Sequence, residues 1–429
     1  MHRAVVAIAI SFCQASRVSR LFPSRLAFFL AIIAVGNAAV AAPQGSSRRA
    51  VNRQVGVLTQ LGRRLFFDPD LSASGRLSCA SCHDPAHAYG PPDAHPVRAG
   101  GKDMREMGIR AVPSLRYKQV TPHFTEHFFD EDDEPDAGVD NGPTGGLTWD
   151  GRADRGRDQA RLPLLSRSEM ANESPAAIVA RVRESTSATL LRDAFGDAVF
   201  VKTETAFAGI LQALEVFEQR PADFYPYNSR YDAWLAGKSV LSHQEMRGLA
   251  AFNDPAKGNC AHCHPSARGA DGTPPQFTDY GFAAIGVPRN NDTPANADPA
   301  FYDLGLCGPL RSDLRDHPEY CGMFKTPTLR NVALRGSFFH NGIFHTLKDV
   351  LSFYAERDTN PEKWYPPNED GVAQKFDDLP LQYHVNINLE PPFDRQAGDK
   401  PVLSAQEIDD VIAFLRTLTD SDLDDQRQP

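Results

Sequence analysis

The 429-residue sequence has no surplus of basic residues and only one long apolar run. Lysine and arginine number 45 against 55 for aspartate and glutamate, and the net charge of −10 argues against a nucleic-acid partner. Outside residues 26–36, no segment is apolar enough to cross a membrane. Alternating strand patterns are scarce, which disfavours a protein built from β-sheets. The sequence therefore predicts an acidic, mostly α-helical protein.

The first 41 residues have the features of an export signal. Arginines precede the apolar run of residues 26–36, and Ala39-Val40-Ala41 follows as a cleavage site of small residues. The run is short for a membrane span, so we expect a signal peptide at 1–41, with a retained anchor as the alternative. A periplasmic protein with no membrane span after cleavage follows from this expectation.

Two pentapeptides of the form C-x-x-C-H, residues 79–83 and 260–264, are the strongest signal in the chain. The two thiols of such a motif can bond both vinyl groups of one porphyrin, and the histidine is then placed to bind the iron. A zinc site would need a second ligand pair at zinc-like spacing, which neither motif has, and a disulfide is the other alternative. We therefore predict two covalently bound haem c groups. The residues that would hold them are Cys79, Cys82, His83, Cys260, Cys263 and His264.

Two further cysteines, Cys307 and Cys321, share a loop that is rich in glycine and proline. In an oxidising compartment we expect them to form a disulfide, with two free thiols as the alternative. Cys13 lies in the predicted signal.

The two halves of the chain carry similar segments in the same order, which indicates a diverged internal duplication. The paired segments are helical runs at 61–67 and 247–252, proline-led segments at 113–116 and 327–331, and aromatic-rich turns at 149–151 and 340–342. We therefore expect two cytochrome c-like haem domains, an N-terminal one at 42–235 and a C-terminal one at 236–429.

Local patterns indicate individual helices and loops. Ser242 with Glu245, and Ser404 with Glu407, have the spacing of capping boxes that begin helices, and further helical stretches lie near 174–197 and 203–219. The insertion at 119–147 contains the acidic run 130–134, which we expect to be a solvated surface loop, with a docking face as the alternative.

The chemistry of a haem iron depends on its sixth coordination position. A second strong ligand favours electron transfer, whereas a vacant position can bind peroxide. Tyr354 lies twelve residues after Gly342, and the same count from Gly151 reaches Pro163. A tyrosine phenolate can ligate ferric iron, and proline has no ligating atom. We therefore predict a second haem closed by Tyr354 and a first haem open beneath Pro163, with a core tyrosine and an ordinary helix breaker as the alternatives.

Peroxide cleavage also needs a group that moves a proton from one oxygen to the other. Gln159 and Glu169 flank Pro163 in the sequence and are the candidates. The alternative for Glu169 is a solvated surface residue.

Several ordered motifs together resemble the bacterial di-haem cytochrome c peroxidase family, including its methylamine-utilisation maturase branch. The matching segments are residues 65–69, 79–85, 149–153, 324–331 and 339–342, together with Tyr354. The resemblance extends over residues 55–420. It implies that the N-terminal haem is peroxidatic, that the C-terminal haem relays electrons, and that Trp149 lies between them as a relay. It also implies that Gln159 and Glu169 are the distal glutamine and glutamate.

The chain departs from the family pattern at three positions. Tyr354 occupies the slot of a methionine ligand, as in the maturase branch, and should lower the potential of the second haem. Asp103 occupies the slot of a loop histidine that caps the resting first haem, and His95 could serve there only with a shifted register. Ala111 occupies the slot of an asparagine that binds an interdomain calcium ion, which makes calcium possible but less expected.

The leading functional prediction is a di-haem c-type peroxidase that reduces hydrogen peroxide to water. Its electrons would come from a small soluble cytochrome c or copper protein. The alternatives are a maturase-type enzyme that oxidises residues of a partner protein, and a di-haem electron-transfer protein without catalytic activity.

Overall fold

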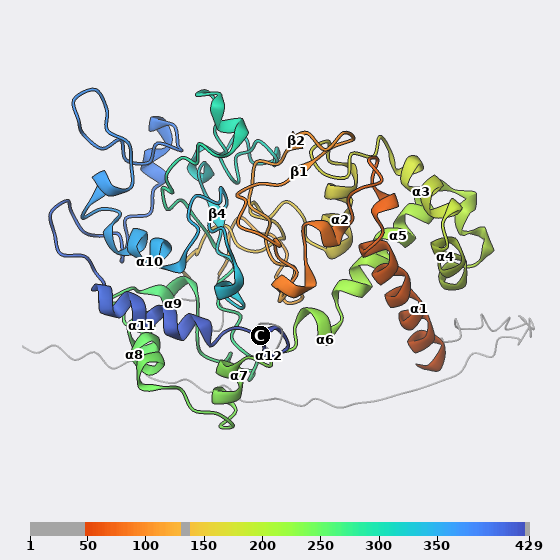
Figure 1. The fold of residues 1–429 in the computed structure, drawn as a ribbon, viewed down its shortest axis with the longest axis horizontal. Coiled ribbons are helices and arrows are strands. Elements are labelled where there is room, and N and C mark those ends of the chain that lie inside the picture. Colours follow the sequence, from red (N-terminus) through yellow and green to blue (C-terminus); the bar gives the residue numbers. More distant parts are fainter. Residues whose placement is uncertain (1–47, 130–137, 425–429) are drawn as a thin grey trace, which may run out of the picture. The chain divides into compact units, whose positions relative to one another are not determined.

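The structure, a computed structural model, describes residues 48–129 and 138–424, and helices dominate this part of the chain (Figure 1). The α-helices are α1 (Arg48–Phe66), α2 (Gly156–Leu165), α3 (Pro175–Glu184), α4 (Ser187–Phe195), α5 (Thr203–Glu218), α6 (Pro221–Phe224), α7 (Arg230–Leu235), α8 (His243–Asn253), α9 (Cys260–Cys263), α10 (Leu347–Glu356), α11 (Ala405–Arg416) and α12 (Ser421–Asp424). The prediction of a mostly α-helical fold is confirmed.

Short 3-10 helices and very short strands connect these helices. The 3-10 helices are η1 (Pro69–Leu71), η2 (Cys79–Ser81), η3 (Pro85–His87), η4 (Asp197–Val201), η5 (Pro294–Ala297), η6 (Pro318–Tyr320), η7 (Val332–Leu334), η8 (Pro361–Lys363) and η9 (Leu381–Asn386). Strands β1 (Ala99–Gly100) and β2 (Glu106–Met107) pair antiparallel, as do β3 (Phe282–Ala283) and β4 (Phe324–Lys325).

Two sequence expectations, the signal peptide at 1–41 and the acidic run 130–134, lie outside the described residues. Within 48–129 and 138–424, none of the helices combines the length and apolar character that a bilayer crossing needs.

The predicted helix starts are confirmed at α8 and α11, where Ser242 with Glu245 and Ser404 with Glu407 form reciprocal capping boxes. The helical character predicted near 174–197 and 203–219 is also confirmed, and the first of these stretches consists of two helices, α3 and α4. The hydroxyl of Ser185 donates to Val182 O at 2.9 Å and accepts the N–H of Ser187 at 3.1 Å. These local bonds compete with the helical ladder and separate α3 from α4.

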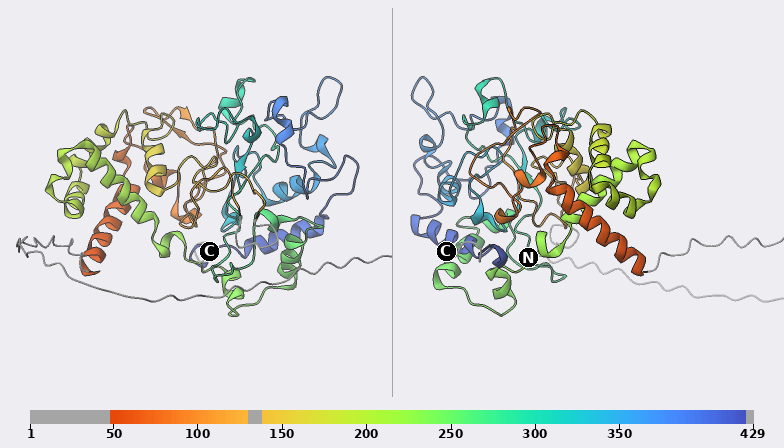
Figure 2. Two further views of the ribbon diagram at one scale, coloured as in Figure 1. Left: turned by 180° about the vertical axis from the view of Figure 1, so that it is seen from behind. Right: turned by 45° about the vertical axis from the view of Figure 1, so that its right-hand side comes forward.

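The buried apolar side chains form two large clusters that follow one another along the chain. The first runs from Leu58 to Phe224 and is formed largely by α1, α3, α4 and α5. The second runs from Tyr231 to Leu418 and includes α8, α10 and α11. Figures 1 and 2 show α1, α3, α4 and α5 gathered together, and α8 beside α11. The domain boundary at 235/236 and the internal duplication stay predictions.

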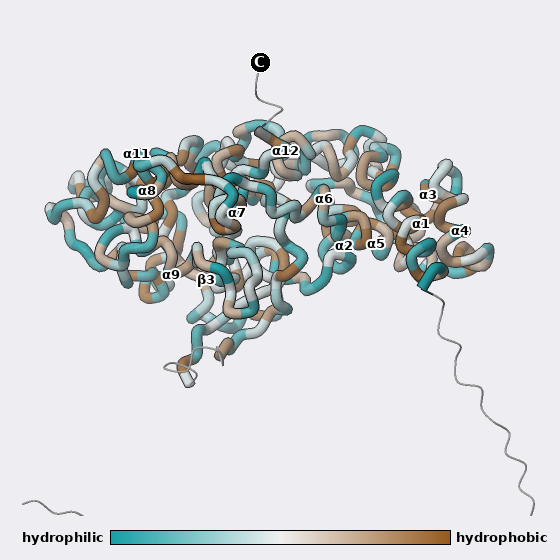
Figure 3. The backbone as a smooth tube through the Cα atoms, turned by 90° about the horizontal axis from the view of Figure 1, so that it is seen from below, coloured by the Kyte–Doolittle hydropathy of each residue, from teal (hydrophilic) through white to brown (hydrophobic). Residues whose placement is uncertain are grey.

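Figure 3 shows apolar and polar residues interspersed along these helices, as expected when one face of a helix is buried. Each fully buried leucine or phenylalanine stabilises the fold by about 1.5–3 kcal/mol relative to an exposed one.

The helix before each C-x-x-C-H motif crosses a later helix at a glycine. A Cβ atom on Gly62 of α1 would lie 1.9 Å from Ala213 O of α5, and one on Gly248 of α8 would lie 1.9 Å from Asp410 O of α11. The two backbones touch at each crossing, so no larger residue fits. In both later helices a phenylalanine, Phe217 or Phe414, packs beside the glycine.

Two buried carboxylates join the segments that carry the first motif to those that carry the second. Asp420, which is fully buried, accepts hydrogen bonds from Arg116, from the Tyr117 hydroxyl and from the Asn331 side chain. The Asp303 carboxylate accepts hydrogen bonds from both Nε and Nη2 of Arg110, at 2.6 and 2.7 Å. Removing one partner of such a buried ion pair typically costs about 3–5 kcal/mol, so these contacts hold the two segments in one arrangement.

The α1–α5 crossing can be tested with two glycines of the same helix. We expect Gly62→Ala to lower the free energy of unfolding by about 1–3 kcal/mol, because its Cβ would overlap Ala213 O. Gly56→Ala is the matched control, because nothing lies within 4 Å of its Cβ, and it should stabilise α1 by about 0.5–1 kcal/mol. Thermal unfolding followed by far-ultraviolet circular dichroism measures both. Equal effects of the two substitutions would contradict the close crossing.

Candidate functional site

Both C-x-x-C-H motifs line one cavity of about 840 Å³. The side chains predicted to attach, ligate or serve the two haems all line this one cavity. They are Cys79, Cys82, His83, Trp149, Gln159, Pro163, Glu169, Cys260, Cys263, His264 and Tyr354. Residues from both halves of the chain therefore meet at one place, although their chemical roles stay predictions.

Each motif presents a histidine with one ring nitrogen already engaged. Nδ1 of His83 bonds to Tyr89 O at 3.0 Å, and Nδ1 of His264 bonds to Phe277 O at 2.8 Å. A carbonyl oxygen can only accept, so Nδ1 carries the proton and Nε2 keeps its lone pair for a metal. Burial lowers the pKa of His83 to about 4 and also lowers the pKa of His264, which favours the neutral ligating form.

The carbonyls that orient these histidines belong to two aromatic residues in a rare backbone conformation. Tyr89 and Phe277 have φ of 54° and 55°, in the left-handed region that bulky residues seldom adopt. The same carbonyls accept the N–H of Leu115 and of Leu329, which lie in the two proline-led segments. Sequence reasoning missed this pair, because the contact is made by a main-chain oxygen and leaves no side-chain signature.

The four thiols of the motifs are unpaired, so the alternative of a disulfide within a C-x-x-C-H motif is wrong. Burial raises the pKa of each thiol, most strongly at Cys79, which keeps the sulfurs protonated until they react. Two free thiols beside a histidine with an available Nε2, on a cavity of this size, fit the requirements of a c-type haem.

Glu169 is held by a close approach of two backbones after α2. Gly101 N donates to Glu169 O at 2.8 Å, and a Cβ on Gly100 would lie 2.2 Å from Ser168 O. The carboxyl lies near the first motif, because its charge contributes to the raised pKa of both Cys79 and Cys82.

Protein packed around Glu169 raises the pKa of its carboxyl, even though the residue keeps accessible surface at the cavity wall. The Ser166 hydroxyl and the charge of Arg152 oppose this rise only in part. Gln159 and Pro163, which are one turn apart on α2, line the same cavity. Glu169 is thus a carboxyl of raised pKa, in the first motif's part of the cavity.

Tyr354 of α10 is packed among aromatic rings beside the second motif. Its ring stacks on Phe393 at a centroid distance of 5.5 Å and contacts Phe339 at 5.9 Å. Burial raises the pKa of its hydroxyl, and the thiols of Cys263 and Cys260 are the next largest causes. The phenol is therefore close to the second pair of thiols, and within the described residues its hydroxyl has no hydrogen-bond partner.

Trp149 contacts segments from both parts of the chain. Its indole Nε1–H donates a hydrogen bond to Ala111 O at 2.8 Å, and its main-chain carbonyl accepts one from Lys325 N–H at 2.9 Å. Ala111 N in turn donates to His340 O at 2.7 Å. Ala111 occupies the position where the family has a calcium-binding asparagine, and both its N–H and its C=O already form hydrogen bonds. A bound calcium ion stays a prediction. In the described part of the chain, no group of three or more His, Cys, Asp or Glu side chains could hold a metal ion.

The two candidates for a capping loop histidine lie away from the cavity. Neither Asp103 nor His95 is among the described residues that line the cavity. The His95 side chain is 74% exposed and pairs with Asp93 at 3.0 Å.

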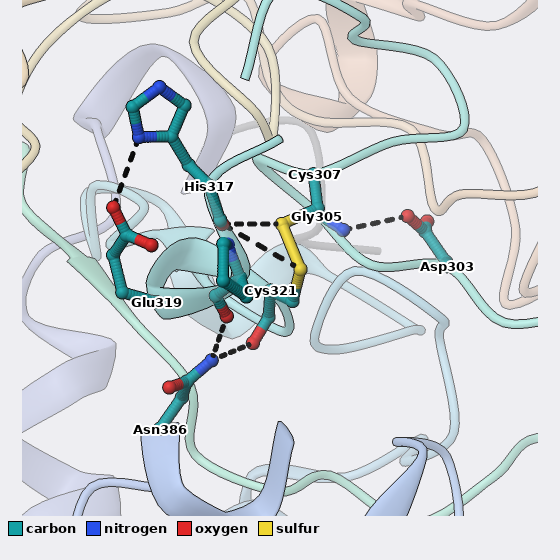
Figure 4. Close-up of a disulfide and its surroundings, with 8 residues drawn as sticks. Asp303, Gly305, Cys307, His317, Glu319, Cys321 and Asn386 are labelled. Carbon is teal, nitrogen blue, oxygen red and sulfur yellow. Dashed lines mark hydrogen bonds and ion pairs between the residues drawn. A yellow bond between two sulfur atoms is a disulfide. The ribbon is translucent and has the colours of Figure 1, made fainter. Parts of the chain in front are cut away.

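The predicted disulfide is confirmed, with Cys307 bonded to Cys321 (Figure 4). Figure 4 shows it beside His317 and Asn386, whose side-chain amide donates to Cys321 O at 3.0 Å. The loop that it closes includes Arg311, whose guanidinium donates to Asp150 O at 2.8 Å. The disulfide thus constrains a segment that is anchored next to Trp149.

A mostly helical fold with two C-x-x-C-H motifs on one cavity defines the class of di-haem redox proteins. A family model described as di-haem cytochrome c peroxidase matches residues 57–240. The chain is 33% identical to the methylamine utilization protein MauG of Paracoccus denitrificans, over 85% of this chain and 88% of that protein. It is 27% identical to cytochrome c551 peroxidase of Nitrosomonas europaea, over 76% and 80% of the two chains.

The crystal structure of the diheme peroxidase BthA from Burkholderia thailandensis is similar, with a TM-score of 0.75 and 38% identity over 85% of this chain and 86% of that one. The chain belongs to the di-haem cytochrome c peroxidase family. It is therefore an oxidoreductase that acts on peroxide, and haem c is the cofactor that membership implies.

Proposed function

We propose that this protein is a periplasmic peroxidase with two covalently attached haem c groups, which reduces hydrogen peroxide with electrons from a small redox protein. The observation that carries the proposal is that the two motifs share one cavity but have unlike neighbours. Glu169 is near the first pair of thiols, and Tyr354 is near the second. The two haems would therefore have different roles.

The first haem would be attached through Cys79 and Cys82 and ligated by Nε2 of His83. The second would be attached through Cys260 and Cys263 and ligated by His264 and the Tyr354 phenolate. When bound, the haems supply the iron that exchanges electrons with peroxide and with the donor. The free thiols, the available Nε2 atoms and the size of the cavity support this assignment.

The protein's own contribution to peroxide cleavage is the movement of a proton. The Glu169 carboxylate accepts the proton of the attacking peroxide oxygen and donates it to the departing oxygen, which leaves as water. The raised pKa of Glu169 suits this exchange, because the group must both take up and release a proton. The Gln159 amide orients the peroxide, and Pro163 leaves its side of the cavity without a ligand for iron.

Electron transfer between the sites would use Trp149. Its indole N–H is held by Ala111 O, which fixes the ring between main-chain segments of both parts of the chain. The second haem would store or relay oxidising equivalents, and two single-electron steps from a donor would restore the enzyme. The net charge of −10 favours a basic region on that donor, a small cytochrome c or copper protein.

An internal duplication accounts for the parallel contacts of the two sites. In each, a left-handed aromatic residue binds both the motif's histidine and a leucine of a proline-led segment. We infer two cytochrome c-like domains, 42–235 and 236–429, preceded by the signal peptide at 1–41.

A maturase-type enzyme that oxidises residues of a partner protein is the second candidate. The closeness of Tyr354 to the second pair of thiols favours it, since an anionic oxygen ligand lowers the haem potential and stabilises oxidised iron. Such an enzyme would turn over peroxide poorly with a reduced cytochrome c. A non-catalytic electron-transfer protein would not turn over peroxide at all.

The role of Glu169 can be measured through its pH dependence. Glu169→Gln should lower kcat/KM for peroxide by about 10²-fold or more, since the amide cannot carry the proton. In the unchanged enzyme, kcat/KM should rise as the pH increases through the raised pKa of Glu169, because the carboxylate is the proton acceptor. The variant should lose this acid limb.

Glu173→Gln is the matched control for Glu169→Gln. The Glu173 side chain lies in the same loop but is 86% exposed. The control substitution should leave both kcat/KM and its pH profile unchanged. Peroxide consumption with a reduced cytochrome c is the assay, and an acid limb that persists in the Glu169→Gln enzyme would contradict the assignment.

The ligand of the second haem can be tested with Tyr354→Phe. The substitution removes the hydroxyl but keeps the ring stacked on Phe393, so the fold should persist while the potential of one haem rises. Redox titration followed by absorption spectroscopy measures this. Tyr320→Phe, at a buried ring that stacks on His317, is the control and should change neither haem. If Tyr354→Phe also leaves both spectra and potentials unchanged, Tyr354 is a packing residue only.

A further inference from the structure

Most of the cationic side chains in the wall of the cavity are neutralised by carboxylates. The buried or half-buried pairs are Arg98 with Asp93, Arg110 with Asp303, Arg116 with Asp420, Lys118 with Glu218, Arg152 with Asp150 and Arg330 with Asp232. Two half-buried cations of the wall, Arg335 and Lys325, form no ion pair with any described residue. A cation without a partner becomes less favourable as its surroundings exclude water.

Arg335 is the less compensated of these two. The Lys325 ammonium donates to Gly146 O and is near Asp150, whose charge raises the pKa of the lysine against the larger effect of burial. No carboxylate acts on Arg335 in this way, and burial alone lowers the pKa of its guanidinium, to about 10. The group therefore stays cationic at neutral pH, in contact with the cavity.

The contacts of Arg335 leave much of its hydrogen-bonding capacity unused. It follows η7 in the part of the chain that carries the second motif. Its Nη2 donates to Val112 O at 3.1 Å, and its Nε donates to Ser337 O at 3.3 Å. A guanidinium has five N–H groups, so three remain for an acceptor in the cavity. None of the described carboxylates of the wall, Glu169 among them, forms an ion pair with this guanidinium.

The guanidinium lies on the side of the first motif, although it comes from the second part of the chain. Its charge contributes to the lowered pKa of His83. The hydrogen bond from Arg335 Nη2 ends on the carbonyl of Val112. The next residue is Pro113, whose carbonyl interacts with the His83 ring. Arg335 is thus close to the histidine of the first motif.

We propose that Arg335 binds a propionate carboxylate of the haem held by Cys79, Cys82 and His83. The inference rests on the proposed attachment of haem at this motif. A propionate is the anion that such a cofactor brings into the cavity, and a guanidinium binds carboxylates with a pair of parallel hydrogen bonds. The bound pair removes the cost of the uncompensated cation. It also makes a residue of the second part of the chain a component of the first haem site.

This contact has an electrostatic consequence. A fixed cation beside the first haem stabilises the reduced iron, which carries less positive charge, and so raises the reduction potential of that haem. The second haem, ligated by His264, should be affected much less.

The test is a redox titration of the holoprotein with Arg335→Leu, Arg335→Lys and the control Arg105→Leu. Arg105 is an exposed arginine of the first part of the chain that forms no ion pair with any described residue. Arg335→Leu should shift the potential of the first haem downward, with a smaller shift at the second. Arg335→Lys should restore most of the lost potential, and Arg105→Leu should change neither haem. Arg335→Gln replaces the leucine variant if that protein does not accumulate.

Several outcomes would overturn the proposal. The first is an unchanged potential in Arg335→Leu or Arg335→Gln. The second is an equal shift in the leucine and lysine variants, which would indicate packing rather than charge. A shift confined to the second haem would assign Arg335 to the other cofactor. The absence of covalent haem from the unchanged protein would instead contradict the proposed function, so the two failures are distinguishable.

Discussion

The site depends on two main-chain carbonyls, those of Tyr89 and Phe277. Each binds the Nδ1–H of a motif histidine and the N–H of a leucine from a proline-led segment. In each site one carbonyl oxygen therefore fixes the tautomer of the histidine and the direction of its free Nε2. The same oxygen also fixes the position of the cavity wall. The left-handed conformation of both residues costs of order 1–3 kcal/mol each, which the surrounding packing must hold in place.

The carbonyls make the two sites alike, and the side chains around them make the sites different. A carboxyl of raised pKa, Glu169, borders the first, and an aromatic cluster around Tyr354 borders the second. The buried bonds of Asp420 and of Arg110 hold these unlike surroundings against one cavity. Family membership accounts for peroxide as the oxidant, and the contrast between the sites is the basis for the proposed division of labour between the haems.

Much of the site could be predicted from the sequence because its signals are local and chemical. The two C-x-x-C-H motifs, the capping boxes at Ser242 and Ser404, and the disulfide partners all depend on residue type and spacing. The exact break between α3 and α4 has no such signal, because it depends on how one hydroxyl, that of Ser185, divides its bonds. The carbonyls of Tyr89 and Phe277 were missed because main-chain acceptors have no residue signature.

Arg335 was missed for a different physical reason. Its importance depends on the absence of a carboxylate among its described neighbours, and that is a property of the folded cavity rather than of any motif. The close approach of Gly100 to Ser168 likewise joins segments that are distant in the sequence.

The central claim is that two nearly identical motifs hold unlike haems, one open and one closed by Tyr354. Electron paramagnetic resonance of the resting ferric protein tests it most directly, because the spin state reports the sixth ligand of each iron. We expect one high-spin signal from the haem on His83 and one low-spin signal from the haem on His264. Two low-spin signals, with no high-spin component, would contradict the account.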